Sequence, residues 1–334
     1  MYKSTIAGVG HYVPETAVTN NDLAKFIDTT DKWIVERTGI NERRWVVEGD
    51  GNSTSAMGLK ASQMALKNAG ISADEIDFIV FATLSPDYYF PGPGVLLQRE
   101  LGIREIGALD VRNQCSGFVY ALSVADQFIK TGMYKTILVV GAELHSPGLD
   151  KTTRGRGVTI IFGDGAGAVV LKRSEDESGI LSTHLHSEGK HAEELCLIGP
   201  ATNRWVDKIM AANDPDDISY YPYMNGNFVF KHAVTRFAEV INEALQQNNA
   251  QASDIDMLIP HQANLRISQF IQRKMGLSDD QVYNNIMRYG NTTAASIPIA
   301  LSEAVQEGKI KKGDLVCMAA FGSGFTWASA LIRW

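Results

Sequence analysis

One internal repeat constrains the fold of this chain more than any other feature of its sequence. Residues 65–83 read ALKNAGISADEIDFIVFAT, and residues 244–262, offset by 179 positions, read ALQQNNAQASDIDMLIPHQ. Both segments have the pattern of a helix end, a polar turn with an acidic residue, and an apolar strand introduced by Ile-Asp. The repeat indicates two fused copies of one α/β unit, with chance similarity between two helix–strand pairs as the alternative.

Apolar periodicity supports an α/β fold. Four short runs rich in branched residues are typical of buried strands, at 77–83, 136–141, 256–260 and 315–321. Helical spacing of apolar side chains occurs at 55–69 and 231–248. We therefore divide the chain into a first half, a connecting excursion and a second half, at 1–173, 174–225 and 226–334. The polar, proline-containing stretch 187–225 fits either a cap over a binding site or a plain surface loop.

Composition excludes several classes of protein. The 334 residues are about 45% hydrophobic and 21% charged, as in ordinary globular proteins. We expect no membrane span, because no segment approaches roughly 20 consecutive apolar residues, and no secretory signal at the N-terminus. The net charge of −7 argues against a nucleic-acid partner. Three scattered cysteines fit neither a disulfide framework nor a zinc site and favour a cytoplasmic location.

Cys115 is the best candidate nucleophile. It lies where a strand-like LDV leads through a polar turn into an apolar helix. Free N–H groups and the positive end of a helix dipole stabilise a thiolate at such a position, and thiolates exchange acyl groups between thioesters. A buried structural cysteine is the alternative. We interpret Cys317, inside the core-like run LVCMAAF, and Cys196 as structural.

His261 and Asn291 are the other candidate catalytic residues. His261 directly follows the strand DMLIP, so it lies at a strand end and can donate a proton or a hydrogen bond. Asn291 follows Gly290, and its amide can hydrogen-bond an enolate oxygen without taking a charge. Each also has a structural interpretation, as a satisfied buried histidine and as a helix cap. Glycine-rich turns at 162–171 and 321–334 lack the GxGxxG and GxxxxGK[ST] spacings, which argues against a nucleotide-phosphate site and favours an oxyanion hole.

Seven sequence blocks follow the order typical of the ketoacyl synthase III family, which the chain resembles over nearly its whole length. They are TTDKWIVERTGINERR at 29–44, the Cys115 segment, RGVTIIFGDGAGAVVL at 156–171, MNGNFVFKHAV at 224–234, PHQANLRI at 260–267, YGNTTAAS at 289–296 and FGSGFTW at 321–327. The resemblance implies a thiolase-like α/β fold with two similar halves in five αβαβα layers, and a homodimer. It implies no cofactor apart from coenzyme A thioesters as substrates, and no metal.

The resemblance also implies a reaction. A catalytic Cys–His–Asn set falls on Cys115, His261 and Asn291. An acyl-coenzyme A acylates Cys115, with the backbone N–H groups of Cys115 and Ser323 as the oxyanion hole. Malonyl-acyl carrier protein then loses carbon dioxide, and the resulting enolate, held by His261 and Asn291, attacks the acyl group. The predicted function is the decarboxylative condensation that starts fatty acid synthesis.

Further binding residues follow from the same resemblance. Coenzyme A contacts are implied for Trp33, Arg37, Arg156, Gly226 and Asn264. Phe90 is implied to close the acyl pocket of the partner across the dimer. Contacts to an acidic carrier protein, which should weaken with salt, are implied for Gln262, Ala263, Asn264, Leu265, Arg266, Lys231, Arg273 and Lys274. A solvated surface charge is the alternative for each of the basic residues.

The sequence departs from the family in two places, and three other functions remain as alternatives. The second glycine turn reads GSG instead of GGG, and the excursion at 187–225 is longer than usual, which suggests a primer other than acetyl. One alternative is a relative from secondary metabolism, making an alkylquinolone precursor, a head-to-head condensation product or an ester. The others are a Cys–His hydrolase and a non-catalytic metal-binding protein. The metal would use His184, His186 and His191, which fit better as the polar face of a strand.

Overall fold

Two β-sheets form the frame of the protein. The computed structural model describes residues 2–174, 176, 178–199 and 217–334. The first sheet has the strand order β1-β7-β6-β4-β5. The bounds of these strands are β1 Lys3–Tyr12, β4 Phe78–Ala82, β5 Gly107–Val111, β6 Thr136–Glu143 and β7 Gly165–Ser174. The second sheet has the order β11-β12-β13-β8, with β8 Gly179–Ser187, β11 Met257–Pro260, β12 Leu315–Gly322 and β13 Thr326–Arg333.

The two sheets repeat one topology. In the first, β4 runs parallel to β6, and β7 lies antiparallel between β6 and β1. In the second, β11 runs parallel to β12, and β13 lies antiparallel between β12 and β8. This repeated topology is what two copies of one α/β unit predict. β8 pairs with β13, so residues 179–187, which the predicted boundaries assign to the connecting excursion, form a strand of the second sheet.

One aspartate in each half explains the Ile-Asp pair of the repeat. The Asp77 carboxylate accepts the backbone N–H of Thr136 at 3.0 Å, and the Asp256 carboxylate accepts that of Leu315 at 2.7 Å. Each aspartate thereby ties the start of one strand to the start of the parallel strand beside it. A charged acceptor suits this role because it compensates a backbone donor that has no partner in the sheet.

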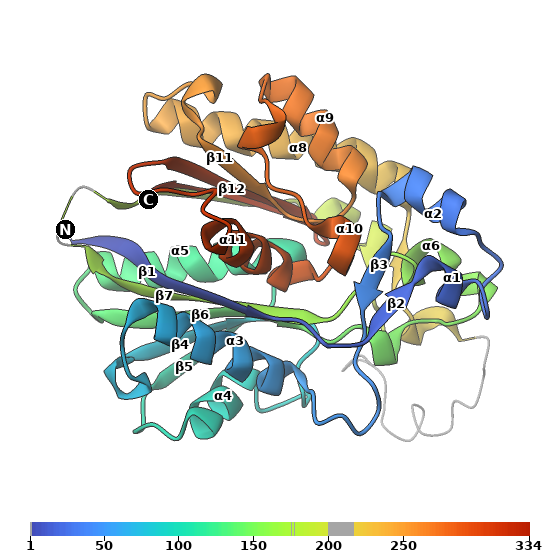
Figure 1. Ribbon diagram of the computed structural model, residues 1–334, viewed down its shortest axis with the longest axis horizontal. Helices are drawn as coiled ribbons and strands as arrows, with labels where there is room; N and C mark the ends of the chain where they lie inside the picture. The colour runs from blue at the N-terminus through green and yellow to red at the C-terminus, as the bar shows by residue number, and fades with distance from the viewer. Residues whose placement is uncertain (1, 175, 177, 200–216) are drawn as a thin grey trace.

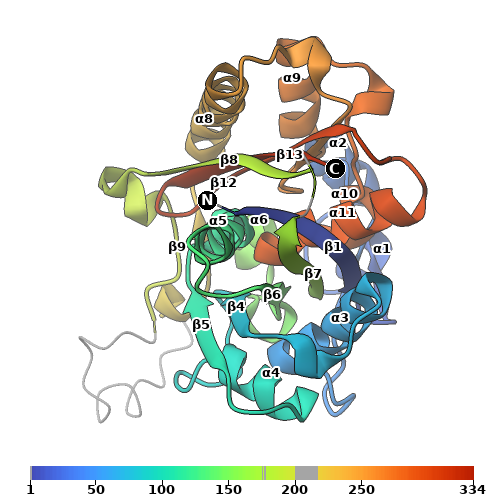
Figure 2. The same cartoon turned by 90° about the vertical axis from the view of Figure 1, so that its left-hand side faces the viewer.

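Helices cover both faces of both sheets (Figures 1 and 2). An apolar cluster joins α3 and α4 to the outer face of the first sheet, and another joins α8 and α9 to the outer face of the second. The largest cluster holds side chains of α5, α11 and both sheets, so these two helices lie between the sheets. The bounds are α3 Thr54–Ala69, α4 Pro93–Leu101, α5 Gly117–Lys130, α8 Gly226–Gln247, α9 Leu265–Met275 and α11 Ser296–Gln306.

Shorter elements gather at one end of the two sheets (Figure 1). An apolar cluster around Ile34, Ile160 and Ile286 packs several of them together. Their bounds are β2 Ala17–Thr19, α1 Asn20–Leu23, α2 Asp31–Thr38, β3 Glu42–Arg44, α6 Arg156–Thr159, β9 Leu195–Cys196, β10 Tyr223–Met224 and α10 Ile286–Tyr289. The centre of the predicted excursion, including the prolines at 200 and 215, lies outside the described residues. No helix of the described residues is long and apolar enough to cross a bilayer.

Most sequence predictions of individual elements are confirmed. The four predicted strands correspond to β4, β6, β11 and β12, and the two predicted helices to α3 and α8. The turn at 321–334 joins two strands, β12 and β13, as expected. The turn at 162–171 is different, because it leads from the short helix α6 into β7.

Candidate active site

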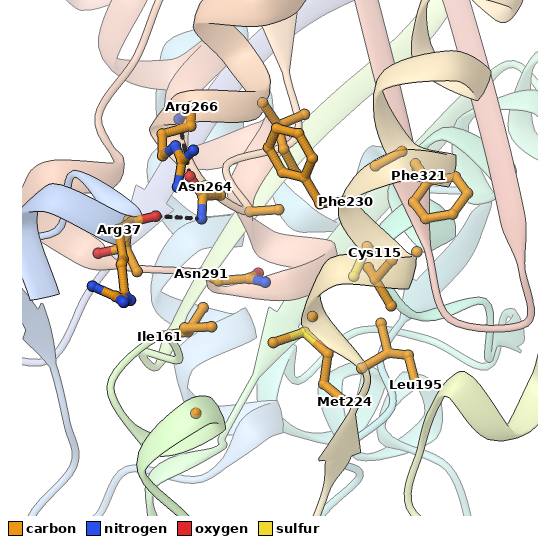
Figure 3. A pocket seen from close by; sticks show the side chains of 18 of the residues that line it. Arg37, Cys115, Ile161, Leu195, Met224, Phe230, Asn264, Arg266, Asn291 and Phe321 are labelled. Carbon is orange, nitrogen blue, oxygen red and sulfur yellow. Dashed lines mark hydrogen bonds between the residues drawn. The ribbon is translucent and has the colours of Figure 1, made fainter.

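A single pocket brings together the three candidate catalytic residues. It has a volume of about 310 Å³ and receives Cys115 from the first half and His261 and Asn291 from the second. Figure 3 shows Cys115 close to Phe321 on one side, with Arg37, Asn264 and Arg266 grouped on the other. Apolar side chains make up much of the wall, including Ile160, Ile161, Leu195, Met224, Val229, Phe230, Phe237 and Phe321.

The backbone places Cys115 at the start of α5. Gln114 has a positive φ of 45°, and residues Gln114–Ser116 form a 3₁₀ turn that leads directly into the helix. Gly322, at the end of β12, makes room for the thiol. A Cβ atom at Gly322 would lie 2.6 Å from the Cβ and 2.9 Å from the Sγ of Cys115, which no side chain can tolerate. Glycine is therefore required where the second sheet meets the nucleophile turn.

Burial decides the resting state of the Cys115 thiol. Removal from water raises its pKa to about 12, and the nearby Glu143 carboxylate acts in the same direction. Hydrogen bonds from the backbone N–H groups of Ser323 and Cys115 lower the pKa by less. The expected resting thiolate is therefore not supported, because desolvation outweighs these donors. The same two N–H groups lie beside the sulfur, where they can also reach the carbonyl oxygen that becomes the oxyanion when the sulfur attacks a thioester.

Glu143 is a buried carboxyl group that the sequence analysis missed. It ends β6 with no exposed surface, and burial raises its pKa to about 7. Its oxygens accept hydrogen bonds from the hydroxyls of Thr83 and Ser85 and from the backbone N–H of Leu84. A charged residue that closes an otherwise apolar strand, as in TILVVGAE, was the available signal.

His261 presents an unpaired nitrogen in the pocket. It follows β11, as predicted, and its backbone N–H donates to the carbonyl of Ala319 at 2.8 Å. Its Nδ1 lies 2.6 Å from the hydroxyl of Ser296, whereas its buried Nε2 has no hydrogen-bond partner among the described residues. Burial lowers the pKa of the imidazole to about 3, so the ring is neutral at physiological pH. It can act as a neutral hydrogen-bond donor.

Asn291 is held by its Oδ1 and its backbone. Its Oδ1 accepts the backbone N–H of Thr293 at 2.8 Å, and its own backbone N–H donates to Ile161 at 2.8 Å. Gly290 precedes it with φ 65°, and a Cβ there would lie 2.5 Å from the carbonyl oxygen of Ile161. The glycine thus allows the close approach that fixes Asn291.

The residues predicted to contact coenzyme A are neighbours in the structure. The guanidinium groups of Arg37 and Arg156 lie 4.4 and 4.8 Å from the centre of the Trp33 ring. Asn264 caps α9 and donates from Nδ2 to the carbonyl of Arg37 at 2.9 Å, the dashed line in Figure 3. Gly226 begins α8 and also lines the pocket. These residues come together from four separate elements.

The predicted carrier-protein contacts divide by exposure. Lys231, Arg266, Arg273 and Lys274 are exposed on α8 and α9, and Ala263, Asn264 and Leu265 are partly buried beside them. Gln262, predicted in the same set, is only 2% exposed. Its side chain bonds inward to backbone groups of Pro260, Tyr283, Asn285 and Ile286. Gln262 therefore braces the loop after β11.

The remaining predicted residues lie as follows. Phe90 is 81% exposed, beside the exposed Tyr88 and Tyr89. The hydroxyl of Ser323 donates to the carbonyl of Leu195, so the departure from GGG ties the second glycine turn to a pocket-lining strand. Cys317 is fully buried in β12.

The histidine-rich segment does not assemble into a ligand set. His184 and His186, on β8, both face Glu243 on α8, at 3.3 and 2.6 Å. His191 instead packs against the rings of Phe228 and His232. Among the residues that the structure describes, no cluster of three or more His, Cys, Asp or Glu side chains is suited to a metal ion.

Comparisons with known proteins decide the family. Residues 109–189 match the family described as 3-oxoacyl-[acyl-carrier-protein (ACP)] synthase III, and residues 245–334 match its C-terminal region. The chain belongs to the 3-oxoacyl-[acyl-carrier-protein] synthase III family. The resemblance predicted from the sequence is confirmed, and with it an acyltransferase of fatty acid biosynthesis.

Relatives cover the chain from end to end. Beta-ketoacyl-[acyl-carrier-protein] synthase III of Rhodospirillum centenum is 46% identical over 99% of both chains, and that of Escherichia coli O9:H4 is 48% identical over 98% of both. A crystal structure of 3-oxoacyl-[acyl-carrier-protein] synthase III from Aquifex aeolicus superimposes with a TM-score of 0.90 at 42% identity, over 99% of this chain and 100% of that one. The α/β fold is thus that of the synthase III family, and fatty acid synthesis is favoured over the secondary-metabolism alternatives.

We predict that Gly322→Ala blocks the nucleophile. The added methyl group would overlap Cys115, so alkylation of Cys115 by iodoacetamide should slow at least about tenfold. Gly148→Ala, where an added Cβ meets nothing within 4 Å, is the matched control. Peptide mass spectrometry would measure both rates, and equal rates would contradict the proposed close approach.

We predict that Glu143→Gln makes Cys115 more reactive in a pH-dependent way. Glu143 has a raised pKa of about 7, so its negative charge opposes the thiolate only above that pH. Below pH of about 6 both proteins should alkylate at the same rate, and near pH 8 the variant should be about threefold faster. A constant ratio from pH 6 to 8 would exclude this electrostatic coupling.

Proposed function

We propose that this protein transfers an acyl group from coenzyme A to Cys115 and condenses it with malonyl-acyl carrier protein. The observation that carries the proposal is the shared pocket of Cys115, His261 and Asn291. A nucleophile, two backbone donors and two neutral side-chain donors there meet the needs of both half-reactions. The family name supports a β-ketoacyl product. The arrangement of the site supports the role proposed for each residue.

In the first half-reaction, the Cys115 sulfur attacks the thioester carbonyl of the acyl-coenzyme A. The oxyanion receives the N–H groups of Cys115 and Ser323, which already point at the sulfur. The tetrahedral intermediate then expels the coenzyme A thiolate, which takes up the proton that Cys115 gives up. Because the resting thiol is neutral, its proton has to pass to the coenzyme A sulfur during this exchange, and free coenzyme A thiol is released.

In the second half-reaction, malonyl-acyl carrier protein loses carbon dioxide and its thioester becomes an enolate. The enolate oxygen lies between Nε2 of His261, which has no hydrogen-bond partner among the described residues, and Nδ2 of Asn291, whose Oδ1 is held by the Thr293 N–H. The enolate carbon attacks the acyl-Cys115 carbonyl and displaces the Cys115 thiolate, which takes up a proton from the medium. Neutral donors suit this step because the negative charge exists only transiently.

Coenzyme A enters past Trp33, Arg37 and Arg156 in this proposal. A purine that stacks on Trp33 has to displace one of the two guanidinium groups that cover the ring. A displaced guanidinium can then stack on the other face of the purine or pair with a phosphate. The starts of α8 and α9, at Gly226 and Asn264, line the same pocket as Cys115.

The acyl primer lies against Leu195 and Met224, which pair across the β9–β10 ribbon. The Ser323 hydroxyl holds Leu195 from the side of the oxyanion hole. We infer that this wall, and with it the excursion, selects the primer.

The family's αβαβα layering is supported by the three core clusters. A cytoplasmic location is in keeping with three free cysteines.

We predict that His261→Ala and Asn291→Ala separate the two half-reactions. Both variants should still acylate Cys115, because their donors act on the enolate, but condensation should fall about 100-fold or more. Intact-mass spectrometry across a panel of acyl-coenzyme A thioesters would measure acylation, with Cys115→Ala as the unreactive control. Rapid hydrolysis of acyl-Cys115 without any ketoacyl product would instead indicate a hydrolase.

We predict that the carrier protein docks on the basic residues of α8 and α9. Lys231, Arg266, Arg273 and Lys274 are exposed cations next to the pocket entrance. The double change Arg273→Glu and Lys274→Glu should weaken malonyl-carrier binding about tenfold or more, with a reduced dependence on salt. The KM for a malonyl-pantetheine substrate that lacks the carrier should stay unchanged, and a parallel rise in both KM values would refute the docking face.

We predict a homodimer formed through the edge strand β5. The exposed residues Tyr88, Tyr89, Phe90 and Leu109 form an apolar patch on this edge and the loop before α4. An exposed edge with aromatic side chains is typical of an interface. The mass of one chain is 36.6 kDa, and sedimentation equilibrium should give twice that mass. The double variant Phe90→Asp with Leu109→Asp should sediment as a monomer. A monomeric wild-type protein would overturn this prediction.

A further inference from the structure

We infer that Ser296 is a positioning residue whose hydroxyl donates its proton to Nδ1 of His261 and so holds the hydrogen of the neutral imidazole on Nε2. The position of the proton follows from hydrogen bonds in this structure. Its consequence for the reaction rests on the proposed function, in which Nε2 must donate a hydrogen bond to the enolate.

The Ser296 hydroxyl lies between two groups. Ser296 is the first residue of α11 and is only 1% exposed. Its Oγ lies 2.6 Å from Nδ1 of His261 and accepts the backbone N–H of Gln262 at 3.3 Å. Within the described residues these are the two hydrogen-bond partners of the hydroxyl. Because the Gln262 N–H can only donate, Nδ1 is the one partner that can accept the hydroxyl proton.

Counting unsatisfied groups separates the two tautomers. If Nδ1 carried the hydrogen, it would donate to Ser296. The buried hydroxyl would then receive two donors and have no acceptor for its own proton, and Nε2 would be a bare lone pair in the pocket. If the hydroxyl donates to Nδ1, only the Nε2–H group lacks a partner, and it faces the space where substrate binds. The second arrangement is favoured because an unsatisfied buried polar group costs about 1–3 kcal/mol.

The surrounding loop keeps the imidazole in this position. The backbone N–H of His261 donates to Ala319 on β12, which fixes the residue to the second sheet. The Gln262 side chain uses both ends to anchor the next residue, donating to two carbonyls and accepting two N–H groups. Burial holds the imidazole neutral over the working pH range. Choice of tautomer is therefore the remaining variable that sets what Nε2 offers to substrate.

The tautomer decides the second half-reaction. An Nε2–H group and the NH₂ group of Asn291 give two neutral donors to the enolate oxygen. A bare Nε2 lone pair would repel that oxygen instead. First-half chemistry depends on the N–H groups of Cys115 and Ser323, so the tautomer affects it less. Loss of Ser296 should consequently damage decarboxylation more than acylation.

The proton position can be measured directly. In protein labelled with ¹⁵N-histidine, the His261 ring signals are assigned by their loss in His261→Asn. We expect Nε2 to carry the hydrogen and Nδ1 to be an unprotonated, hydrogen-bonded nitrogen, and Ser296→Ala to remove this preference. Ser302→Ala is the matched control. Ser302 is a buried serine on the same helix, 2.9 Å from Nδ1 of His11, so its loss should change only the His11 signals.

The half-reactions provide the functional test. Ser296→Ala should lower malonyl decarboxylation about ten- to a hundredfold and Cys115 acylation by less than about threefold. Ser296→Thr, which keeps the hydroxyl, should restore most of the lost decarboxylation. A wild-type Nδ1–H tautomer would overturn the inference, and so would equal losses in both half-reactions with an unchanged His261 spectrum.

Failure of the proton assignment can be told apart from failure of the proposed function. If Ser296→Ala does not fold, the wild-type spectrum alone still supports or refutes the proton assignment. If the wild-type protein shows no malonyl decarboxylation at all, the proposed function fails while the assignment of the proton stands or falls on the spectrum.

Discussion

Burial of the reacting side chains is the constraint on which the rest of the site depends. It keeps Cys115 as a thiol, His261 as a neutral imidazole and Glu143 close to the point of losing its proton near neutral pH. The resting site therefore holds dipoles in place of charges. A site of this kind stabilises negative charge where it develops on the substrate, because its donors are already oriented. The close packing of two sheets and two central helices makes this burial possible.

Much of the fold could be predicted from local sequence patterns. The Ile-Asp pair that marks each copy of the repeat has a physical cause, the bond from the aspartate to the neighbouring parallel strand. Apolar runs identified the central strands because those strands are buried on both faces. The start of a helix pointed to Cys115 and the end of a strand to His261. That they meet Asn291 in one pocket came only from the family resemblance, since no spacing in the chain encodes it.

What could not be predicted depends on contacts between distant elements. Whether the pKa of Cys115 is raised or lowered depends on how deeply the second sheet buries the thiol. The position of a cysteine at the start of a helix does not reveal whether burial outweighs the N–H donors. Gln262 lies in a motif otherwise rich in surface residues, and only the packing of α10 behind it shows that it points inward. Ser296 was invisible as a functional residue because a serine at a helix start is common. Its role depends on a ring that is 35 positions away in the chain.

The turns that begin α5 and α11 occupy equivalent positions in the two halves, but the halves are not identical. Gln114 and Thr293, offset by 179 positions, both adopt positive φ, but the next residue is a cysteine in one turn and an alanine in the other. β5 likewise has no counterpart in the second sheet as far as the chain is described. A chain with two equivalent open edges could add copies indefinitely and grow into a fibre. In the proposed homodimer, pairing of β5 about a two-fold axis would cover this edge in both copies, so association would close at two chains.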